Sequence, residues 1–236
     1  MAKTNALPVS DYAMHNPSPR DLKDHIFYGL VLDPSQEHFR DAIWTKSNRI
    51  VFCNSIAGTG KTLVAVATAA LMVEHGLYKY LKYIAAPYGT DKLGFLRGDL
   101  DQKAAPYYDP LYQALVKLGY DPMRVIKQSG VCDKTGECFV ECRPHTFLRG
   151  MNLEDSVVII DEAQNYTVPD LKKTLTRVCD SSKVIVIGHN SQKDINGSSG
   201  FTDYLKWFEK EPYCEVCTLT NNHRGIVSRK ADELSI

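Results

Sequence analysis

The residues with the clearest chemical potential form a short glycine-rich segment that is followed by an apolar stretch. The segment matches the phosphate-binding pattern G-x-x-x-x-G-K-T, except that Ser55 stands where the pattern has its first glycine. Backbone N–H groups of such a loop offer positive partial charge to a phosphate. Lys61 would neutralise β- and γ-phosphate oxygens, and the Thr62 hydroxyl would ligate Mg²⁺. The predicted nucleotide-binding residues are Ser55, Ile56, Ala57, Gly58, Thr59, Gly60, Lys61 and Thr62.

Two adjacent carboxylates, Asp161 and Glu162, follow an apolar run that begins at Ser156. An α/β sheet places its ligand chemistry at the carboxyl ends of its strands. Asp161 would hold Mg²⁺, directly or through water, and Glu162 would activate the water that attacks the γ-phosphate. Kinases of small molecules seldom need the second carboxylate, because their acceptor hydroxyl replaces the water. The pair therefore favours hydrolysis.

Short strands and helices that alternate along the chain would position both motifs. We expect strands at residues 49–53, 80–86, 156–161, 183–188 and 215–220. We expect helices between them, including residues 60–75, 108–118, 168–178 and 202–210. This alternation predicts an α/β fold, a mostly parallel five-stranded core sheet with helices on both faces. Turn signals and alternating residues predict an inserted β-hairpin at about 125–145.

Composition limits the remaining possibilities. Residues 1–27 combine prolines with polar residues and predict a loosely ordered N-terminal arm, which leaves 28–236 as a single domain. Lys plus Arg and Asp plus Glu number 28 each, so nucleic acid would need a local groove. Seven scattered cysteines fit a reducing compartment, and no secretory signal is visible. The uncharged stretch Leu63–Val73 is about half of the roughly 20 residues that a membrane span needs. We expect a cytoplasmic protein.

Further motifs appear in the same order as in a known family. They are Lys92–Leu100, Pro106–Tyr107, Pro110–Tyr112, Phe147–Gly150, Ile160–Asn165, Leu175–Arg177 and Ser198–Gly200. Together with Gly58–Thr62 they resemble the PhoH family of phosphate-starvation-type ATPases, over about residues 28–230. The resemblance implies a RecA-like P-loop NTPase related to superfamily 1 helicase cores. It also implies ATP and Mg²⁺ as cofactors and a suspected action on RNA.

The resemblance to helicase cores implies further nucleotide contacts. Gln36 would read the adenine edge, because an amide both donates and accepts hydrogen bonds. Gln192 would sense the γ-phosphate. Arg224 would meet it, because a planar guanidinium can hold the negative charge that spreads in the transition state. Arg229 is the alternative to Arg224.

Single-stranded RNA or DNA is the macromolecular partner that the resemblance implies. Two segments lie where helicase relatives contact single strands, with cations for phosphates and aromatic faces for bases. The candidate residues are Lys92, Phe95, Arg97, Thr146 and Arg149. Phe95, like Phe147 in the second segment, could instead be packed under the sheet.

Two function classes stay open. One is a nucleic-acid-dependent ATPase, which the helicase-type glutamine and arginine motifs favour. The other is a nucleotide-driven switch or assembly factor that acts on protein partners, which the zero net charge favours. A zinc site from Cys132, Cys138, Cys142 and His145 has suitable spacing, but free cysteine is also a common core residue.

The length of the chain also predicts assembly. Helicase relatives bind ATP between two RecA-like lobes, and this chain has residues for one such lobe. A neighbouring copy could supply the second wall, and head-to-tail contacts of that kind form rings when the rotation closes. We expect a homo-oligomer, with a hexameric ring as the leading form. Arg177 or Arg229 would act across the subunit boundary if Arg224 serves its own subunit.

Overall fold

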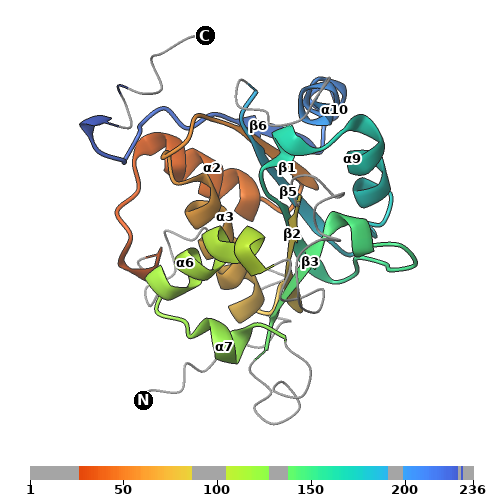
Figure 1. Ribbon diagram of the computed structural model, residues 1–236, viewed down its shortest axis with the longest axis horizontal. Coiled ribbons are helices and arrows are strands. Elements are labelled where there is room, and N and C mark those ends of the chain that lie inside the picture. Colours follow the sequence, from red (N-terminus) through yellow and green to blue (C-terminus); the bar gives the residue numbers. More distant parts are fainter. Residues whose placement is uncertain (1–26, 87–104, 128–137, 191–198, 228–229, 231–236) are drawn as a thin grey trace.

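The computed structural model describes residues 27–86, 105–127, 138–190, 199–227 and 230, which form a six-stranded sheet with helices on both faces (Figure 1). The strands are β1 Ile50–Asn54, β2 Tyr80–Ala85, β3 Val140–Pro144, β4 Ser156–Ile160, β5 Lys183–Gly188 and β6 Cys214–Cys217. Their order across the sheet is β3-β2-β4-β5-β1-β6, and every neighbouring pair is parallel. The predicted α/β fold with a parallel sheet is confirmed.

The register of the central strands brings three loops to one edge of the sheet. Asn54 at the end of β1 lies beside Gly188 at the end of β5, and Ile160 at the end of β4 lies beside Val186. All three strands are almost wholly buried, as expected for the interior of a parallel sheet. The segments that follow β1, β4 and β5 therefore emerge side by side.

Helices cover the sheet in two layers, each with its own apolar core. On one face lie α2 Pro34–Trp44, α3 Lys61–Glu74 and α6 Asp109–Lys117 (Figure 1). On the other face lie α9 Val168–Leu175 and α10 Gly200–Phe208. The shorter elements are η1 Phe27–Gly29, η2 Ala105–Tyr108, α7 Pro122–Val125, η3 His145–Phe147 and η4 Ala163–Asn165. Helix α3 lies between α2 and α6 against the sheet, which explains why its sequence is apolar on most sides.

A capping box begins α2, and its Asp33 also contacts His223, which follows β6. The Asp33 carboxylate accepts hydrogen bonds from the backbone N–H groups of Ser35 and Gln36, and Gln36 Oε1 accepts one from Asp33 N. Burial by itself would raise the pKa of Asp33, but hydrogen bonds from Ser35, Gln36 and His223 lower it to about 2. Asp33 is therefore a carboxylate at any physiological pH.

A buried lysine begins β5. Lys183 has no exposed surface, and its Nζ donates a hydrogen bond of 2.6 Å to the backbone carbonyl of Thr45. Burial, together with the nearby charge of Arg49, lowers the pKa of Lys183 to about 7. The lysine ties the end of α2 to the central sheet.

The structure corrects the expected hairpin, the expected number of five strands and the expected bounds of the last strand. The second arm of the expected hairpin is β3, which pairs in parallel with β2 as a sixth strand, and Val140 forms a parallel bridge with Ile126. Residues 128–137 lie outside the described residues. The last strand, β6, begins and ends earlier than the predicted range 215–220.

The N-terminal arm and the absence of a membrane-spanning helix were also expected. Residues 1–26 lie outside the described residues, so the N-terminal arm and the domain boundary at 28 stay predictions; Phe27 is buried in the core. In the described part of the chain, no helix combines the length and apolar character that crossing a membrane requires.

Candidate active site

The phosphate-binding loop, residues 55–62, joins β1 to the N-terminus of α3. Gly58 and Gly60 have φ values of 79° and 83°, a left-handed conformation that glycine adopts without strain. A Cβ atom at Gly58 would lie 2.6 Å from Asn222 Oδ1, and one at Gly60 would lie 2.8 Å from Gln36 Nε2. Both glycines are therefore required by conformation and by the close approach of neighbouring segments.

Ser55, which departs from the usual glycine, ties the loop to the segment after β6. Its side-chain Oγ accepts a hydrogen bond of 2.6 Å from the backbone N–H of Leu219. Its own N–H donates to the carbonyl of Gly188 over 3.1 Å. The residue is 4% exposed, so neither contact competes freely with water. A glycine here would leave the Leu219 N–H without its acceptor.

Lys61 folds back onto the loop that carries it. Its Nζ donates hydrogen bonds to the backbone carbonyls of Ser55 and Ile56, over 2.7 and 2.8 Å. Burial lowers the pKa of Lys61, against the opposing effects of Cys53 and the nearby carboxylates. The ammonium group thus lies inside the loop, where phosphate oxygens would compete with these two carbonyls for it.

Asp161 collects three hydrogen bonds at the end of β4. Its Oδ2 accepts from Thr62 Oγ1 over 2.8 Å and from the Tyr83 hydroxyl over 2.6 Å, and its Oδ1 accepts from Glu162 N over 2.8 Å. Asp161 is 2% exposed. Burial and the charge of Asp161 hold the pKa of Tyr83 well above its usual value, so the phenol stays a donor. A carboxylate and a hydroxyl in contact are hard oxygen ligands that suit Mg²⁺.

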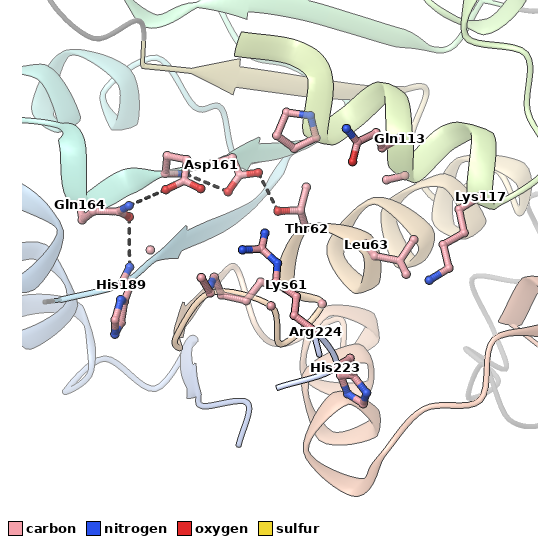
Figure 2. A pocket seen from close by; sticks show the side chains of 17 residues that line it. Lys61, Thr62, Leu63, Gln113, Lys117, Asp161, Gln164, His189, His223 and Arg224 are labelled. Carbon is pink, nitrogen blue, oxygen red and sulfur yellow. Dashed lines mark hydrogen bonds between the residues drawn. The ribbon is translucent and has the colours of Figure 1, made fainter. Parts of the chain in front are cut away.

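The Glu162 side chain is exposed in the cavity, and its backbone is strained. Its φ and ψ are 50° and 41°, a left-handed conformation that costs a non-glycine residue about 1–2 kcal/mol. The side chain accepts a hydrogen bond from Gln164 Nε2, and Gln164 Oε1 accepts one of 3.1 Å from His189 N (Figure 2). Strain of this kind is common at functional sites. Gln164 and His189 were not predicted, although Gln164 stands only two residues after Glu162.

Residues 219–224, which follow β6, lie against the phosphate-binding loop. His223 N donates to the carbonyl of Gly58 over 2.9 Å, and His223 Nε2 lies 3.0 Å from Asp33 Oδ2. Arg224 N donates to Asn222 Oδ1 over 2.8 Å. The Arg224 side chain lines the same cavity as Lys61, within one chain (Figure 2). The other predicted γ-phosphate residues, Gln192 and Arg229, lie outside the described residues.

These groups surround a cavity of about 390 Å³. Most of the predicted loop residues line it, but Ser55, Ile56 and Thr59 are not among its lining residues. Helix α6, which was not predicted to take part, forms the opposite wall. Its lining residues are Pro110, Gln113, Ala114 and Lys117. Sequence singled out Pro110 only as part of a family motif and gave no sign of the other three, because the packing of α6 on α3 brings this helix beside the loop.

Gln36 has a different set of contacts from the expected adenine edge. Its Nε2 donates to the carbonyl of Thr59 over 2.9 Å, and its Oε1 accepts from Asp33 N over 3.2 Å. The residue is 6% exposed and does not line the cavity. Both halves of the amide are therefore used to hold α2 against the phosphate-binding loop.

A second cavity of about 410 Å³ lies between η3 and α9, and we call it the basic pocket. The predicted nucleic-acid residues Thr146 and Arg149 line it, and the structure adds Lys173 and Arg177. Phe147 is 42% exposed, so it is not packed under the sheet as the alternative required. The other predicted nucleic-acid residues lie outside the described residues: Lys92, Phe95 and Arg97.

His145 lines the basic pocket beside Tyr166. The two rings are tilted, with centroids 4.9 Å apart, and His145 Nε2 lies 3.8 Å from Asp170 Oδ1. Burial lowers the pKa of His145, although Asp170 opposes the shift. Across the described ranges, no cluster of three or more His, Cys, Asp or Glu side chains could hold a metal ion. Cys138 is disulfide-bonded, and Cys132 lies outside those ranges.

The known sequences that resemble this chain come from one family. A family model described as PhoH-like protein matches residues 31–231. The chain is 34% identical over 186 residues to Protein PhoH of Escherichia coli K12, which covers 77% of this chain and 50% of that protein. It is 40% identical over 152 residues to a PhoH-like protein of Bacillus subtilis 168, covering 64% and 45% of the two chains. The chain spans about half the length of these curated relatives.

Solved structures with similar folds are more distant. The Pyrococcus furiosus Hef helicase domain matches with a TM-score of 0.43 and 16% identity, over 78% of this chain and 38% of that one. A PRRSV helicase matches with a TM-score of 0.37 and 12% identity, over 76% and 32%. Scores this low say nothing about the residues of the site.

Proposed function

Because the chain belongs to the PhoH-like protein family, we propose that it is a Mg²⁺-dependent ATPase whose hydrolysis is coupled to single-stranded nucleic acid, RNA foremost. The observation that carries the enzymatic half is the contact of Thr62 with Asp161, 99 residues apart in the sequence and 2.8 Å apart in space. This contact joins the phosphate-binding loop to the acidic strand end, as the chemistry of a P-loop NTPase requires.

Each residue of the cavity has a distinct part in this proposal. Thr62 and Asp161 would hold Mg²⁺, Asp161 directly or through water; the ion would neutralise charge on the phosphate oxygens. Lys61 would exchange the carbonyls of its own loop for β- and γ-phosphate oxygens. Glu162 would take a proton from the attacking water, and the hydrogen bond from Gln164 would orient its carboxylate. Arg224 would face the γ-phosphate from the same subunit.

The test of the chemistry separates binding from hydrolysis. Lys61→Ala should weaken ATP binding, whereas Glu162→Gln should keep binding and lower turnover on the order of 10²-fold or more. Phosphate release and the binding of a fluorescent ATP analogue would be measured for both variants. Lys172→Ala is the control, because Lys172 is an exposed lysine that lines neither cavity. Hydrolysis at the parent rate by Glu162→Gln would refute the assignment of the base.

The basic pocket supports the nucleic-acid half of the proposal. Arg149, Lys173 and Arg177 converge there, and cations of this kind bind phosphates with release of counterions. Single-stranded RNA should stimulate hydrolysis, and binding should weaken as salt rises. Arg149→Ala with Lys173→Ala should reduce stimulation and leave basal hydrolysis unchanged, and Lys172→Ala should change neither.

The alternative function is a nucleotide-driven switch that acts on protein partners. Zero net charge is the observation that favours it. The two functions differ in one measurement. Failure of every single strand to bind at low salt, together with active ATP hydrolysis, would favour the switch.

We also propose that the protein assembles with copies of itself. A neighbouring copy could close the cavity and supply Arg177 or Arg229 in trans. Light scattering with Mg²⁺ and a nonhydrolysable ATP analogue should show an oligomer, with a hexamer as the leading form. A monomer whose specific hydrolysis rate is independent of protein concentration would refute the shared site. The cytoplasmic location stays a prediction.

A further inference from the structure

The Asp161 carboxylate at the end of β4 accepts a hydrogen bond from a residue outside the motifs identified in the sequence. Its Oδ2 accepts one hydrogen bond of 2.8 Å from Thr62 Oγ1 (Figure 2) and another of 2.6 Å from the Tyr83 hydroxyl. A carboxylate oxygen has about two lone-pair positions for donors. Oδ2 is therefore fully engaged, and the shorter of its two hydrogen bonds comes from strand β2.

Tyr83 is held firmly by its surroundings. The residue is 1% exposed, and its backbone lies in the sheet between Cys142 of β3 and Ile159 of β4. Its ring packs edge-on against the ring of Tyr108, with the centroids 6.4 Å apart and the planes at 78°. The sheet and this aromatic contact therefore fix the position of the hydroxyl before any ligand binds.

Tyr83 supports the cavity from behind. It is not among the residues that line the cavity, whereas Thr62 and Asp161 both are. The pairing of β2 with β4 runs from Tyr80 to Ile84, so the backbone already joins the two strands. A phenylalanine would fill the same space in the core. The hydroxyl adds to that packing a hydrogen bond to Asp161.

The orientation of Asp161 decides how Thr62 faces the cavity. A hydroxyl has one hydrogen and two lone pairs. Because the hydrogen of the Thr62 hydroxyl points to Asp161 Oδ2, the lone pairs of Oγ1 point elsewhere and are available to a cation. A carboxylate that could turn would release that hydrogen, and Oγ1 would lose its orientation. Tyr83 opposes the turn because it holds the same oxygen.

We infer that Tyr83 is a positioning residue of the proposed Mg²⁺ site: its phenol fixes the Asp161 carboxylate, which in turn orients the Thr62 hydroxyl for metal binding. The inference rests on the proposed nucleotide function. It adds a residue of β2 to a site assigned so far to the phosphate-binding loop and the end of β4. Groups that hydrogen-bond to metal ligands in this way commonly set metal affinity.

The experiment removes one hydroxyl and measures metal-dependent binding. Tyr83→Phe keeps the ring, and Tyr166→Phe is the matched control, because Tyr166 is also buried and its hydroxyl donates to the backbone carbonyl of Ile84 over 3.3 Å. Calorimetry would measure the affinity for the β,γ-imido analogue of ATP, first in EDTA and then at increasing Mg²⁺. In Tyr83→Phe, the Mg²⁺ concentration that gives half of the gain in affinity should rise about tenfold. Affinity in EDTA should be unchanged, and Tyr166→Phe should change neither quantity.

The outcomes separate this role from a structural one and from the proposed function. An equal loss of affinity in EDTA and in Mg²⁺ would overturn the inference, because Tyr83 would then shape the loop as a whole. A Mg²⁺ requirement in Tyr83→Phe no higher than that in Tyr166→Phe would also overturn it. If the parent protein binds the analogue no more tightly with Mg²⁺ than in EDTA, the proposed Mg²⁺-dependent function fails, and the inference fails with it.

Discussion

Replacing Ser55 with alanine tests how the phosphate-binding loop is attached to the segment that follows β6. Ser55 Oγ accepts the backbone N–H of Leu219 over 2.6 Å, and both residues are buried. Ser55→Ala removes the acceptor and adds no bulk. The Leu219 N–H would stay buried without a partner, because alanine has no side-chain oxygen and water does not reach the site freely.

The expected loss follows from this burial. A buried donor left without an acceptor costs about 1–3 kcal/mol of the free energy of unfolding. Ser181 provides a matched control, because its Oγ accepts the backbone N–H of Asp155 over 2.9 Å at an exposed position. Water can replace that hydroxyl, so Ser181→Ala should cost no more than about 1 kcal/mol.

Urea unfolding would measure both variants at pH 7. The midpoint of Ser55→Ala should fall further than that of Ser181→Ala, with equal slopes showing that both unfold over the same surface. ATP affinity should fall for Ser55→Ala as well, because Leu219 leads directly into the segment that carries Arg224. Equal losses of stability in the two variants would refute the reasoning that burial makes the Ser55 hydrogen bond important.

Two further predictions concern charged groups whose pKa values are lowered, Lys183 and Asp33. The folded-state pKa of Lys183 is lowered to about 7 from 10.5, so between pH 7 and pH 10.5 the unfolded chain binds more protons than the folded one. The free energy of unfolding should therefore rise with pH across that window. Lys183→Met should flatten the rise in a series of urea titrations. The folded-state pKa of Asp33 is lowered to about 2, so its stabilisation is complete above its unfolded pKa of 3.8 and is lost as pH falls toward 2. Asp33→Ala should therefore cost about 0.5–2 kcal/mol at pH 7 and progressively less in acid. A gap between Asp33→Ala and the parent that does not change with pH would contradict the role of the carboxylate.

The parts of the fold that sequence predicted best are those in which pattern and burial agree. Strand β5 has the predicted bounds, Lys183–Gly188, because four buried β-branched residues end at a glycine. Helix α9 begins at Val168 as predicted, where the Thr167 side chain accepts the Asp170 N–H as an N-cap. The proximity of Thr62 and Asp161 follows from two motifs that each end a buried strand of the same parallel sheet.

Strand β3 shows why the rest could not be predicted. An alternating pattern at Cys138, Val140 and Cys142 reports that one face of a strand is buried, but not which strand it pairs with. An edge strand of a parallel sheet alternates in the same way as a hairpin arm, because one of its faces is less covered. The tertiary position of β3 beside β2 decides between them, and it depends on contacts distant in the sequence.

Gln36 illustrates the corresponding limit for the site. A glutamine in the first turn of a helix is compatible with a capping box and with a ligand contact, and the two differ only in what lies beyond the side chain. Here Gly60 approaches so closely that a Cβ would lie 2.8 Å from Gln36 Nε2. The close approach ties the Gln36 amide to the loop in this structure, and a contact of Gln36 with adenine stays a prediction.

Both ends of the described chain therefore act on the same loop. Gln36 supports it at Thr59, Ser55 holds Leu219, and His223 reaches both Gly58 and Asp33. Movement of Lys61 from its loop carbonyls to a phosphate would alter the backbone that these contacts share. Since Arg224 follows His223 directly, such a movement would also shift Arg224, the arginine proposed to face the γ-phosphate. If the loop binds nucleotide as proposed, the Ser55 hydrogen bond to Leu219 would couple that binding to the placement of Arg224, and a glycine at position 55 would lack this bond.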